Sequence, residues 1–258
     1  MTTAHLDRAG VRLRFDVIGS GPVVLMTHGF AASSRMFAAA AERLAAEATV
    51  ITWDMRGHGG SDYPPEQAEY SAALAVADMV ALLDHVGADR ATLLGHSLGG
   101  YLSLVFALDH PDRTSALVLV DTGPGFRKEA GRERWNQMAE GFAVRYTERG
   151  LGGMGTSDEL DADQHRDATG LVLAARGILP QHDSRVIDGL PSITVPTLVV
   201  VGEHDTAFVD GSGYMAERIP GADLAVIAGA GHAPPVSHTD EFVAVVTAFM
   251  RSRRATTS

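Results

Sequence analysis

Short apolar segments recur along the chain, and stretches with the apolar spacing of helices separate them. Residues 11–18 alternate apolar and polar side chains, which is typical of a strand with one buried face. Residues 7–10 read as a turn that joins this strand to a short first strand. Further segments are largely apolar, as strands covered on both faces are: residues 23–27, 50–53, 91–94, 116–120, 197–201 and 224–227.

Helical segments lie between these strands. An alanine-rich stretch predicts a helix over residues 36–48. Ser71 can cap a second helix that Gly87 ends, and a last helix is expected over about residues 239–251. Because strands alternate with helices, the pattern indicates an α/β fold with a doubly wound, mostly parallel, eight-stranded sheet.

One long segment breaks the alternation. Residues 122–191 contain no buried strand, and residues 135–140 and 170–176 have helical character. Connections in α/β units are usually short, so an ordinary crossover is the weaker interpretation. The expected organisation is therefore a core of residues 1–121 and 192–258, with a helical cap inserted over residues 122–191.

Composition narrows the class of protein. The chain of 258 residues has a formal net charge of −11, which argues against nucleic acid or an anionic membrane as a partner. It has no cysteine, which excludes disulfides, thiolate metal sites and a thiol nucleophile. The sequence has neither a leader-like apolar region nor a segment long enough to cross a bilayer, so we expect a cytoplasmic protein.

The segment Gly95-His96-Ser97-Leu98-Gly99 lies between a predicted strand and a predicted helix. A G-x-S-x-G sequence in this context indicates a nucleophile elbow, where glycines allow a sharp turn and the serine hydroxyl projects above the sheet. Ser97 is therefore the candidate nucleophile.

A serine hydroxyl needs a base within reach, and the base needs an orienting acid. Asp205 follows the apolar strand that ends at Val201, and His232 follows the last strand. Both lie where open α/β sheets hold their sites, past the carboxyl ends of strands. Asp121, which ends the strand before the cap, stays open as an alternative acid.

An acyl-transfer site also needs donors for the tetrahedral oxyanion. The backbone N–H of Leu98 can supply one, and the loop after residues 23–27 can supply the other through Phe30. His28, in the same loop, is more suited to holding the loop than to acting as a second base.

Other kinds of site are not indicated. Residues 54–62 can brace a tight loop or bind substrate through Asp54 and Arg56, and the bracing role is favoured. The chain lacks phosphate-binding and dinucleotide-binding motifs, and its histidines lack metal-ligand spacing, so neither a cofactor nor a metal is expected.

Taken together, these residues resemble the α/β-hydrolase fold superfamily over nearly the whole chain. The matching segments are His28-Gly29-Phe30, residues 54–59, residues 95–100, residues 202–205 and Gly231-His232. The resemblance implies catalytic Ser97, Asp205 and His232, with Phe30 and Leu98 at the oxyanion hole and a cap after the sixth strand.

Several residues of this chain differ from those typical of particular branches of the family, and these differences narrow the range of expected reactions. Epoxide hydrolases and haloalkane dehalogenases of this fold have Asp at the position of Ser97, and carbon–carbon hydrolases commonly have Trp at the position of Ala233. Cofactor-free perhydrolases of this fold have a sequence like Gly-Phe-Ser at the nucleophile elbow, whereas this chain has Gly95-His96-Ser97, so they are set apart as well.

The expected function is a cofactor-free serine hydrolase of small to medium carboxylic esters or lactones. A carbon–carbon hydrolase of ring-cleavage products and a triad-bearing small-molecule receptor remain the alternatives. Within the cap, Trp135 and Met138 are the candidate substrate-binding residues, with packing of the cap as the alternative role.

Overall fold

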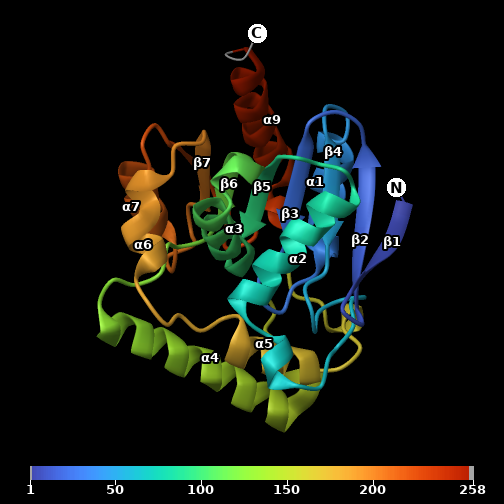
Figure 1. The fold of residues 1–258 in the computed structure, drawn as a ribbon. Helices are drawn as coiled ribbons and strands as arrows, with labels where there is room; N and C mark the ends of the chain where they lie inside the picture. The colour runs from blue at the N-terminus through green and yellow to red at the C-terminus, as the bar shows by residue number, and fades with distance from the viewer. Residues whose placement is uncertain (1, 256–258) are drawn as a thin grey trace.

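A single mixed sheet organises the molecule in the computed structural model, which describes residues 2–255 (Figure 1). The strand order is β1-β2-β4-β3-β5-β6-β7-β8, and every pair from β4 to β8 is parallel. The strands are β1 (Thr2–Arg8), β2 (Val11–Gly19), β3 (Val23–Thr27), β4 (Thr49–Trp53), β5 (Ala91–His96), β6 (Thr114–Val120), β7 (Thr197–Gly202) and β8 (Asp223–Ile227). The predicted eight-stranded, mostly parallel fold is confirmed.

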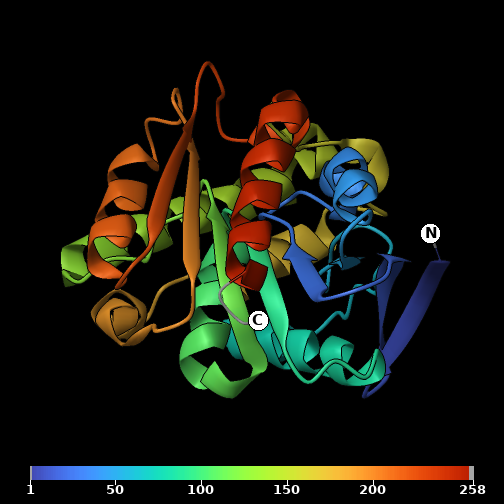
Figure 2. The same cartoon turned by 90° about the horizontal axis from the view of Figure 1, so that it is seen from above.

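Helices cover both faces of the sheet, as Figure 2 shows from above. Helices α1 (Ala38–Leu44) and α9 (Thr239–Ala255) pack together, and their apolar residues share one core cluster with one face of the strands. The other face packs against α2 (Ala72–His85), α3 (Leu98–Asp109), α6 (Arg185–Gly189) and α7 (Val209–Arg218). Alternate residues of a central strand therefore enter opposite cores: Val199 packs in the core beneath α2, α3, α6 and α7, and Val200 packs in the core beneath α1 and α9.

Short elements complete the chain. Helix α8 (Pro234–Ser237) precedes α9, and single 3₁₀ turns link the larger elements. They are η1 (Ser34–Phe37), η2 (Gln67–Glu69), η3 (Pro111–Arg113), η4 (Gly150–Gly153), η5 (Ala162–Gln164) and η6 (Leu190–Ser192).

The predicted helix boundaries are confirmed in part. Ser71 caps α2 by accepting a hydrogen bond from the Leu74 N–H at 3.1 Å, as expected from its residue type. The helix predicted over residues 36–48 instead begins as η1 and ends at Leu44. The chain must turn there to enter β4 beside β2, and a Cβ on Gly19 would collide with the carbonyl oxygen of Ala48.

The regular elements of the segment between β6 and β7 are all helices, and coil joins them. This segment contains α4 (Glu129–Arg149), α5 (Thr169–Gly177) and α6, and α4 packs along α5. In Figure 1 α4 and α5 lie across the edge where the parallel strands end. The Asn136 side chain ties α4 to the strand-free segment after α5 through two hydrogen bonds, at 2.8 and 2.9 Å, with the Gln181 backbone.

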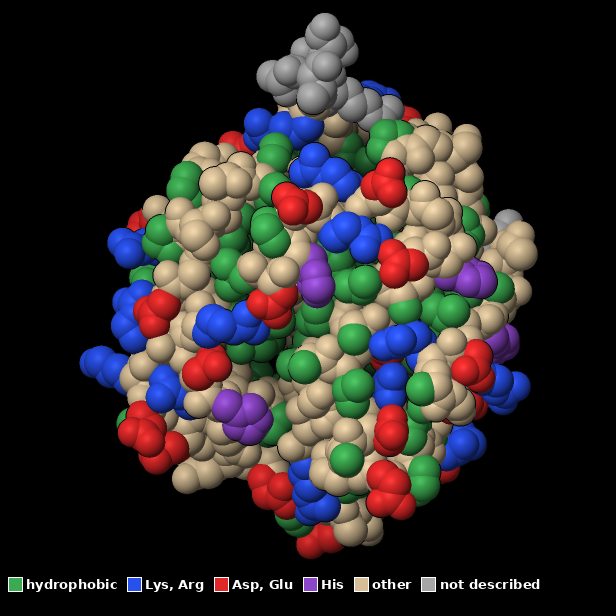
Figure 3. All heavy atoms as spheres, viewed as in Figure 1, with side chains coloured by type: hydrophobic (Ala, Val, Ile, Leu, Met, Phe, Trp, Pro, Cys, Tyr) green, Lys and Arg blue, Asp and Glu red, His purple; other side chains and the backbone are tan. Residues whose placement is uncertain are grey.

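The surface shows no concentration of one charge on the face seen in Figure 3, where acidic and basic side chains are interspersed. No helix among residues 2–255 is long and apolar enough to cross a membrane.

Residues 54–62 brace the sheet edge, as the sequence favoured. Asp54 accepts hydrogen bonds from the backbone N–H groups of Ser34 at 2.7 Å and Gly60 at 2.8 Å. The buried Arg56 guanidinium instead turns to helix α2, where it donates to both oxygens of Asp78, at 2.6 and 2.9 Å. This charged pair holds the loop after β4 against α2.

Removing one member of that pair should be costly. We expect Asp78→Ala to lower the free energy of unfolding by about 3–5 kcal/mol, because the buried Arg56 guanidinium loses both bonds to Asp78 and keeps only the partly exposed Glu69 as a carboxylate partner. Urea unfolding followed by circular dichroism measures the change. The control is Asp84→Ala on the same helix, which removes an exposed ion pair with Arg113 and should cost about 1 kcal/mol or less. Equal losses in the two variants would contradict the role of the buried pair.

Candidate active site

Ser97 occupies a strained turn between β5 and α3. Its backbone angles are φ 51° and ψ −116°, which few non-glycine residues adopt. A Cβ on Gly95 would collide with the backbone of Gly99, and a Cβ on Gly99 would collide with the carbonyl group of Thr27. Only glycine fits on either side, so the sequence pattern around Ser97 is a steric requirement of this turn.

Thr122 supports the same turn from the neighbouring strand. Its hydroxyl donates to the carbonyl oxygen of Ser97 at 2.6 Å, and a Cβ on Gly100 would lie 2.5 Å from its methyl group. The sequence analysis did not identify Thr122. Its position directly beyond β6, which pairs with β5, was the available signal.

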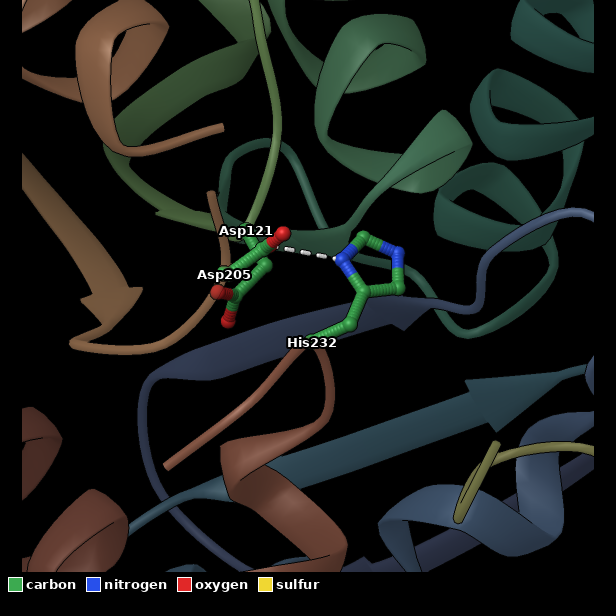
Figure 4. A group of neighbouring side chains, drawn as sticks. All are labelled: Asp121, Asp205 and His232. Carbon is green, nitrogen blue, oxygen red and sulfur yellow. Dashed lines mark hydrogen bonds and ion pairs between the residues drawn. The ribbon is translucent and has the colours of Figure 1, made fainter. Parts of the chain in front are cut away.

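His232 and Asp205 are brought together from two different strand ends. Nδ1 of His232 lies 2.7 Å from Oδ2 of Asp205, as Figure 4 shows. The Phe208 ring stacks on His232 with centroids 5.1 Å apart and an interplanar angle of 22°. The imidazole is thus held by a carboxylate on one nitrogen and an aromatic ring on one face, and sequence reasoning missed the ring.

Within the described residues, the Ser97 hydroxyl and His232 form no hydrogen bond. Nδ1 of His232 is bonded to Asp205, so Nε2 is the nitrogen that can accept a proton. A serine hydroxyl reaches a new partner by rotation about one side-chain bond.

His96 contacts both the backbone and the ring of His232. Its Nε2 donates to the carbonyl oxygen of His232 at 2.7 Å, and the two ring centroids are 4.7 Å apart. Burial lowers the pKa of His96 well below its usual value, and the neighbouring His232 lowers it further. The partner of His96 lies 136 positions further along the chain, so no local sequence pattern indicates this contact.

Asp121 lies beside Asp205 and His232, and it is fully buried. One of its oxygens, Oδ1, accepts from the Gly202 N–H at 2.8 Å. Donor atoms of Asp121, Asp205 and His232 all lie within 4.8 Å of one another. Burial raises the pKa of Asp121 to about 9. The neighbouring Asp205 carboxyl group, through its charge and a hydrogen bond, also raises this pKa. The alternative acid of the sequence analysis is therefore present at the site, while the 2.7 Å bond to His232 comes from Asp205.

These three groups are also a possible cation site by their types, but their bonding argues against that use. Oδ2 of Asp205 and Nδ1 of His232 are already bonded to each other, so neither atom is free to coordinate a cation.

The loop after β3 lies against the Ser97 turn. A Cβ on Gly29 would be 3.2 Å from Cβ of Ser97. His28 spans this loop, because Nδ1 lies 2.7 Å from the Gly29 carbonyl oxygen and Nε2 accepts from the Met55 N–H at 3.0 Å. Leu98 begins α3, so its backbone N–H has no partner within that helix.

Two further histidines hold the loop at Ala31, whose φ is 60°. The Ala31 N–H donates to Nε2 of His58 at 3.2 Å, and Nε2 of His165 donates to the Ala31 carbonyl oxygen at 3.0 Å. His165 belongs to the segment between β6 and β7, so that segment is tied directly to the loop carrying Phe30.

Aromatic rings cover Phe30 from helix α4. The Phe30 ring centroid lies 5.6 Å from that of Phe142 and 6.1 Å from that of Tyr146. The two predicted substrate-binding residues of the cap lie elsewhere. The Trp135 indole N–H donates to the Leu179 carbonyl oxygen at 2.8 Å, which is not part of the Ser97 turn, and the Met138 residue is 41% exposed.

Comparison with known proteins places this arrangement in a family. The sequence profile of the alpha/beta hydrolase fold matches residues 22–148. A pimeloyl-[acyl-carrier protein] methyl ester esterase of Chromobacterium violaceum is 33% identical over 253 residues, covering 90% of this chain and 96% of the relative. The chain therefore belongs to the α/β-hydrolase fold family.

Solved structures agree with this assignment. A thermophilic esterase from Thermogutta terrifontis superposes with a TM-score of 0.81 at 26% identity, covering 98% of this chain and 99% of the esterase. Est816, described as an N-acyl homoserine lactone degrading enzyme, gives a TM-score of 0.70 at 28% identity, covering 95% of this chain and all of that one.

The buried histidines make stability depend on pH. Burial lowers the pKa values of His28, to about 4, and of His58, His96 and His165. The unfolded chain takes up these protons near pH 6.5 and the folded chain does not, so stability is present above pH 6.5 and is lost as pH falls below it. The raised pKa of Asp121 acts in the opposite sense, but with one proton against four.

We therefore expect the urea midpoint to be lower at pH 5.5 than at pH 7.5. Tryptophan fluorescence during urea titration measures it, and the slope of the transition should stay the same if the protein unfolds in one step. A midpoint that is unchanged or higher at pH 5.5 would contradict the assignment of these histidines as neutral in the folded protein.

Proposed function

We propose that this protein is a cofactor-free serine hydrolase that cleaves small to medium carboxylic esters or lactones. The observation that carries the proposal is the strained Ser97 turn together with the Asp205–His232 pair, all beyond the carboxyl ends of the parallel strands. The named activities of the relatives, a methyl ester esterase and a lactone-degrading enzyme, support the same reaction class.

In the proposed mechanism, Ser97 Oγ attacks the acyl carbon while Nε2 of His232 takes the hydroxyl proton. Asp205 keeps the other proton of the ring on Nδ1 and stabilises the imidazolium that forms. The protonated His232 then gives its proton to the leaving alcohol, or to the ring oxygen of a lactone. Water attacks the acyl-enzyme with His232 again as base, which releases the acid and restores the serine.

The oxyanion of each tetrahedral intermediate would be stabilised by the backbone N–H groups of Leu98 and Phe30. The N-terminus of α3 favours negative charge at the same place. His28 supports the Phe30 donor through its span from Gly29 to Met55.

We further propose that residues 122–191 act as a cap over this site. The hydrogen bond from His165 to Ala31 and the contact of Phe142 with Phe30 support a cap that is attached to the loop carrying Phe30 and forms the ceiling of the site. Apolar aromatic surface there suits an acyl chain better than a charged group.

Replacing the nucleophile tests the proposal directly. We expect Ser97→Ala to lower kcat by about 10⁶ while the protein stays folded, since the acyl-enzyme can no longer form. Turnover of p-nitrophenyl esters and of a simple lactone measures this, and a serine-reactive phosphonate followed by peptide mass spectrometry should label Ser97.

The control is Ser103→Ala, which removes a buried hydroxyl bonded to the Gly99 carbonyl oxygen on the same helix and should keep phosphonate labelling. Phosphonate labelling at a serine other than Ser97, or a fully active Ser97→Ala protein, would overturn the assignment. Activity on a dienoate ring-cleavage product without ester turnover would favour the carbon–carbon hydrolase instead.

The ceiling can be tested by acyl chain length. We expect Phe142→Ala to move the preferred ester toward longer chains, because it removes the ring that covers Phe30. Trp135→Ala should instead lower the unfolding free energy by up to roughly 3 kcal/mol with little change in preference, because Trp135 is bonded within the segment between β6 and β7. Ester profiles and melting temperatures of both variants decide this, and a reversed pattern would place Trp135 in the pocket.

A further inference from the structure

We infer that Asp121 is a positioning residue that stays protonated at neutral pH and donates a hydrogen bond to Asp205, fixing the carboxylate that orients His232. The inference rests on the proposed function only in giving Asp205 and His232 a catalytic role. The protonation of Asp121 and its bond to Asp205 stand on the structure of the site.

The backbone places Asp121 between the two strands that matter. Its N–H donates to the Val200 carbonyl oxygen of β7 at 2.9 Å, and its φ of 45° is one that Asp and Asn tolerate better than most residues. The side chain is thereby directed to the start of the turn that carries Asp205, where Oδ1 accepts from the Gly202 N–H.

The second oxygen shows where the proton must be. Oδ2 of Asp121 is buried and faces no N–H or O–H donor among residues 2–255. The nearby polar groups are Asp205 and His232: one side-chain oxygen or nitrogen from each of the three residues lies within 4.8 Å of the other two. Figure 4 shows the carboxyl groups of Asp121 and Asp205 next to each other. An ionised oxygen left without a donor away from water is strongly disfavoured, whereas a protonated one can donate to the Asp205 carboxylate.

The surroundings decide which of the two acids holds the proton. Asp205 accepts the His232 Nδ1–H at 2.7 Å, so this carboxyl group already has a side-chain donor, which Asp121 lacks. Asp121 has one backbone donor and is fully buried, and the charges that raise its pKa come from Asp205 and from Glu159 of the segment between β6 and β7. His232 is the nearby group that could carry positive charge, and it is bonded to Asp205. Two carboxyl groups in such contact share one proton, and the more buried group keeps it.

A protonated Asp121 has a consequence for activity at high pH. Burial and the Asp205 charge raise its pKa to about 9, so the proton is lost at the alkaline end of the assay range. The bond to Asp205 then disappears and two negative charges meet in a buried site, which disfavours the geometry that holds His232. Hydrolysis should therefore fall at alkaline pH through the ionisation of Asp121.

Variants at this position separate the bond from the charge. Asp121→Asn keeps a donor for Asp205, tolerates the same backbone angles and cannot ionise. Asp121→Ala removes the donor and leaves the Gly202 N–H unpaired. We expect Asp121→Ala to lower kcat by about tenfold with little change in KM, and Asp121→Asn to restore most of that loss and to lack the alkaline fall. Asp205→Asn should lower kcat far more than Asp121→Asn.

The matched control is Asp210→Asn, an exposed acid in the first turn of α7. Its pH profile should keep the alkaline fall of the wild type. An alkaline fall that persists in Asp121→Asn, or an alanine variant that the asparagine variant does not improve upon, would overturn the positioning role.

Protonation can be measured without any turnover. In protein with ¹³C-labelled aspartate carboxyl carbons, one carboxyl resonance should titrate far above the others and be missing from Asp121→Asn. If the Asp121 resonance titrates in the ordinary acidic range, the inference is wrong even when esters are hydrolysed and Ser97 is labelled. If no ester is hydrolysed and Ser97 is not labelled, the proposed function fails, while the carboxyl resonance still decides the state of Asp121.

Discussion

The parallel register of β5, β6 and β7 is the constraint on which the rest of the site depends. His96 pairs with Val120, and Val120 pairs with Val200, so β5 and β6 end at the same level and β7 continues for two residues to Gly202. The next residues continue the ladder, because the Ser97 N–H donates to Val120 and the Asp121 N–H donates to Val200, each at 2.9 Å. The candidate nucleophile and Asp121 therefore lie on adjacent steps of one sheet edge, and Asp205 lies in the turn that follows β7. A change of register would separate these groups.

Burial gives the histidines around this edge their structural use. A neutral imidazole can donate from one nitrogen and accept at the other, so it can join two backbone segments that are far apart in sequence. His28, His58 and His165 each do this, and the loop that carries Phe30 is held on both sides by them. Low pH would charge these rings and remove their acceptor nitrogens, which couples the loop geometry to the neutral state of the site.

The same low-polarity surroundings act in opposite directions on acids and bases. They keep His96 neutral, so that its Nε2–H can hold the His232 carbonyl oxygen, and they raise the pKa of Asp121. Asp205 differs from Asp121 because it accepts the hydrogen bond from His232. The two carboxyl groups thus differ in their hydrogen-bond partners, and this difference is the basis for their separate proposed roles.

Local sequence determined the elements and the chemistry that they carry. The alternating and continuous apolar segments predicted the strands, because side chains on a strand must match the cores on its two faces. The glycines at 95 and 99 predicted the Ser97 turn, because no side chain fits there. The order of Ser97, Asp205 and His232 at strand ends indicated one site, since parallel strands end at a common edge.

Only the tertiary structure decided how those groups contact one another. The order of residues along the chain favoured Asp205 as the acid but left Asp121 open, because both follow strands. The packing of the two turns brings Asp205 into contact with His232 and buries Asp121 beside it. Thr122, Phe208 and His165 gain their contacts from segments distant along the chain, so no local pattern marks them. Hydrophobic periodicity specifies which face of an element is buried, but the partner of each polar side chain depends on the three-dimensional packing of the whole chain.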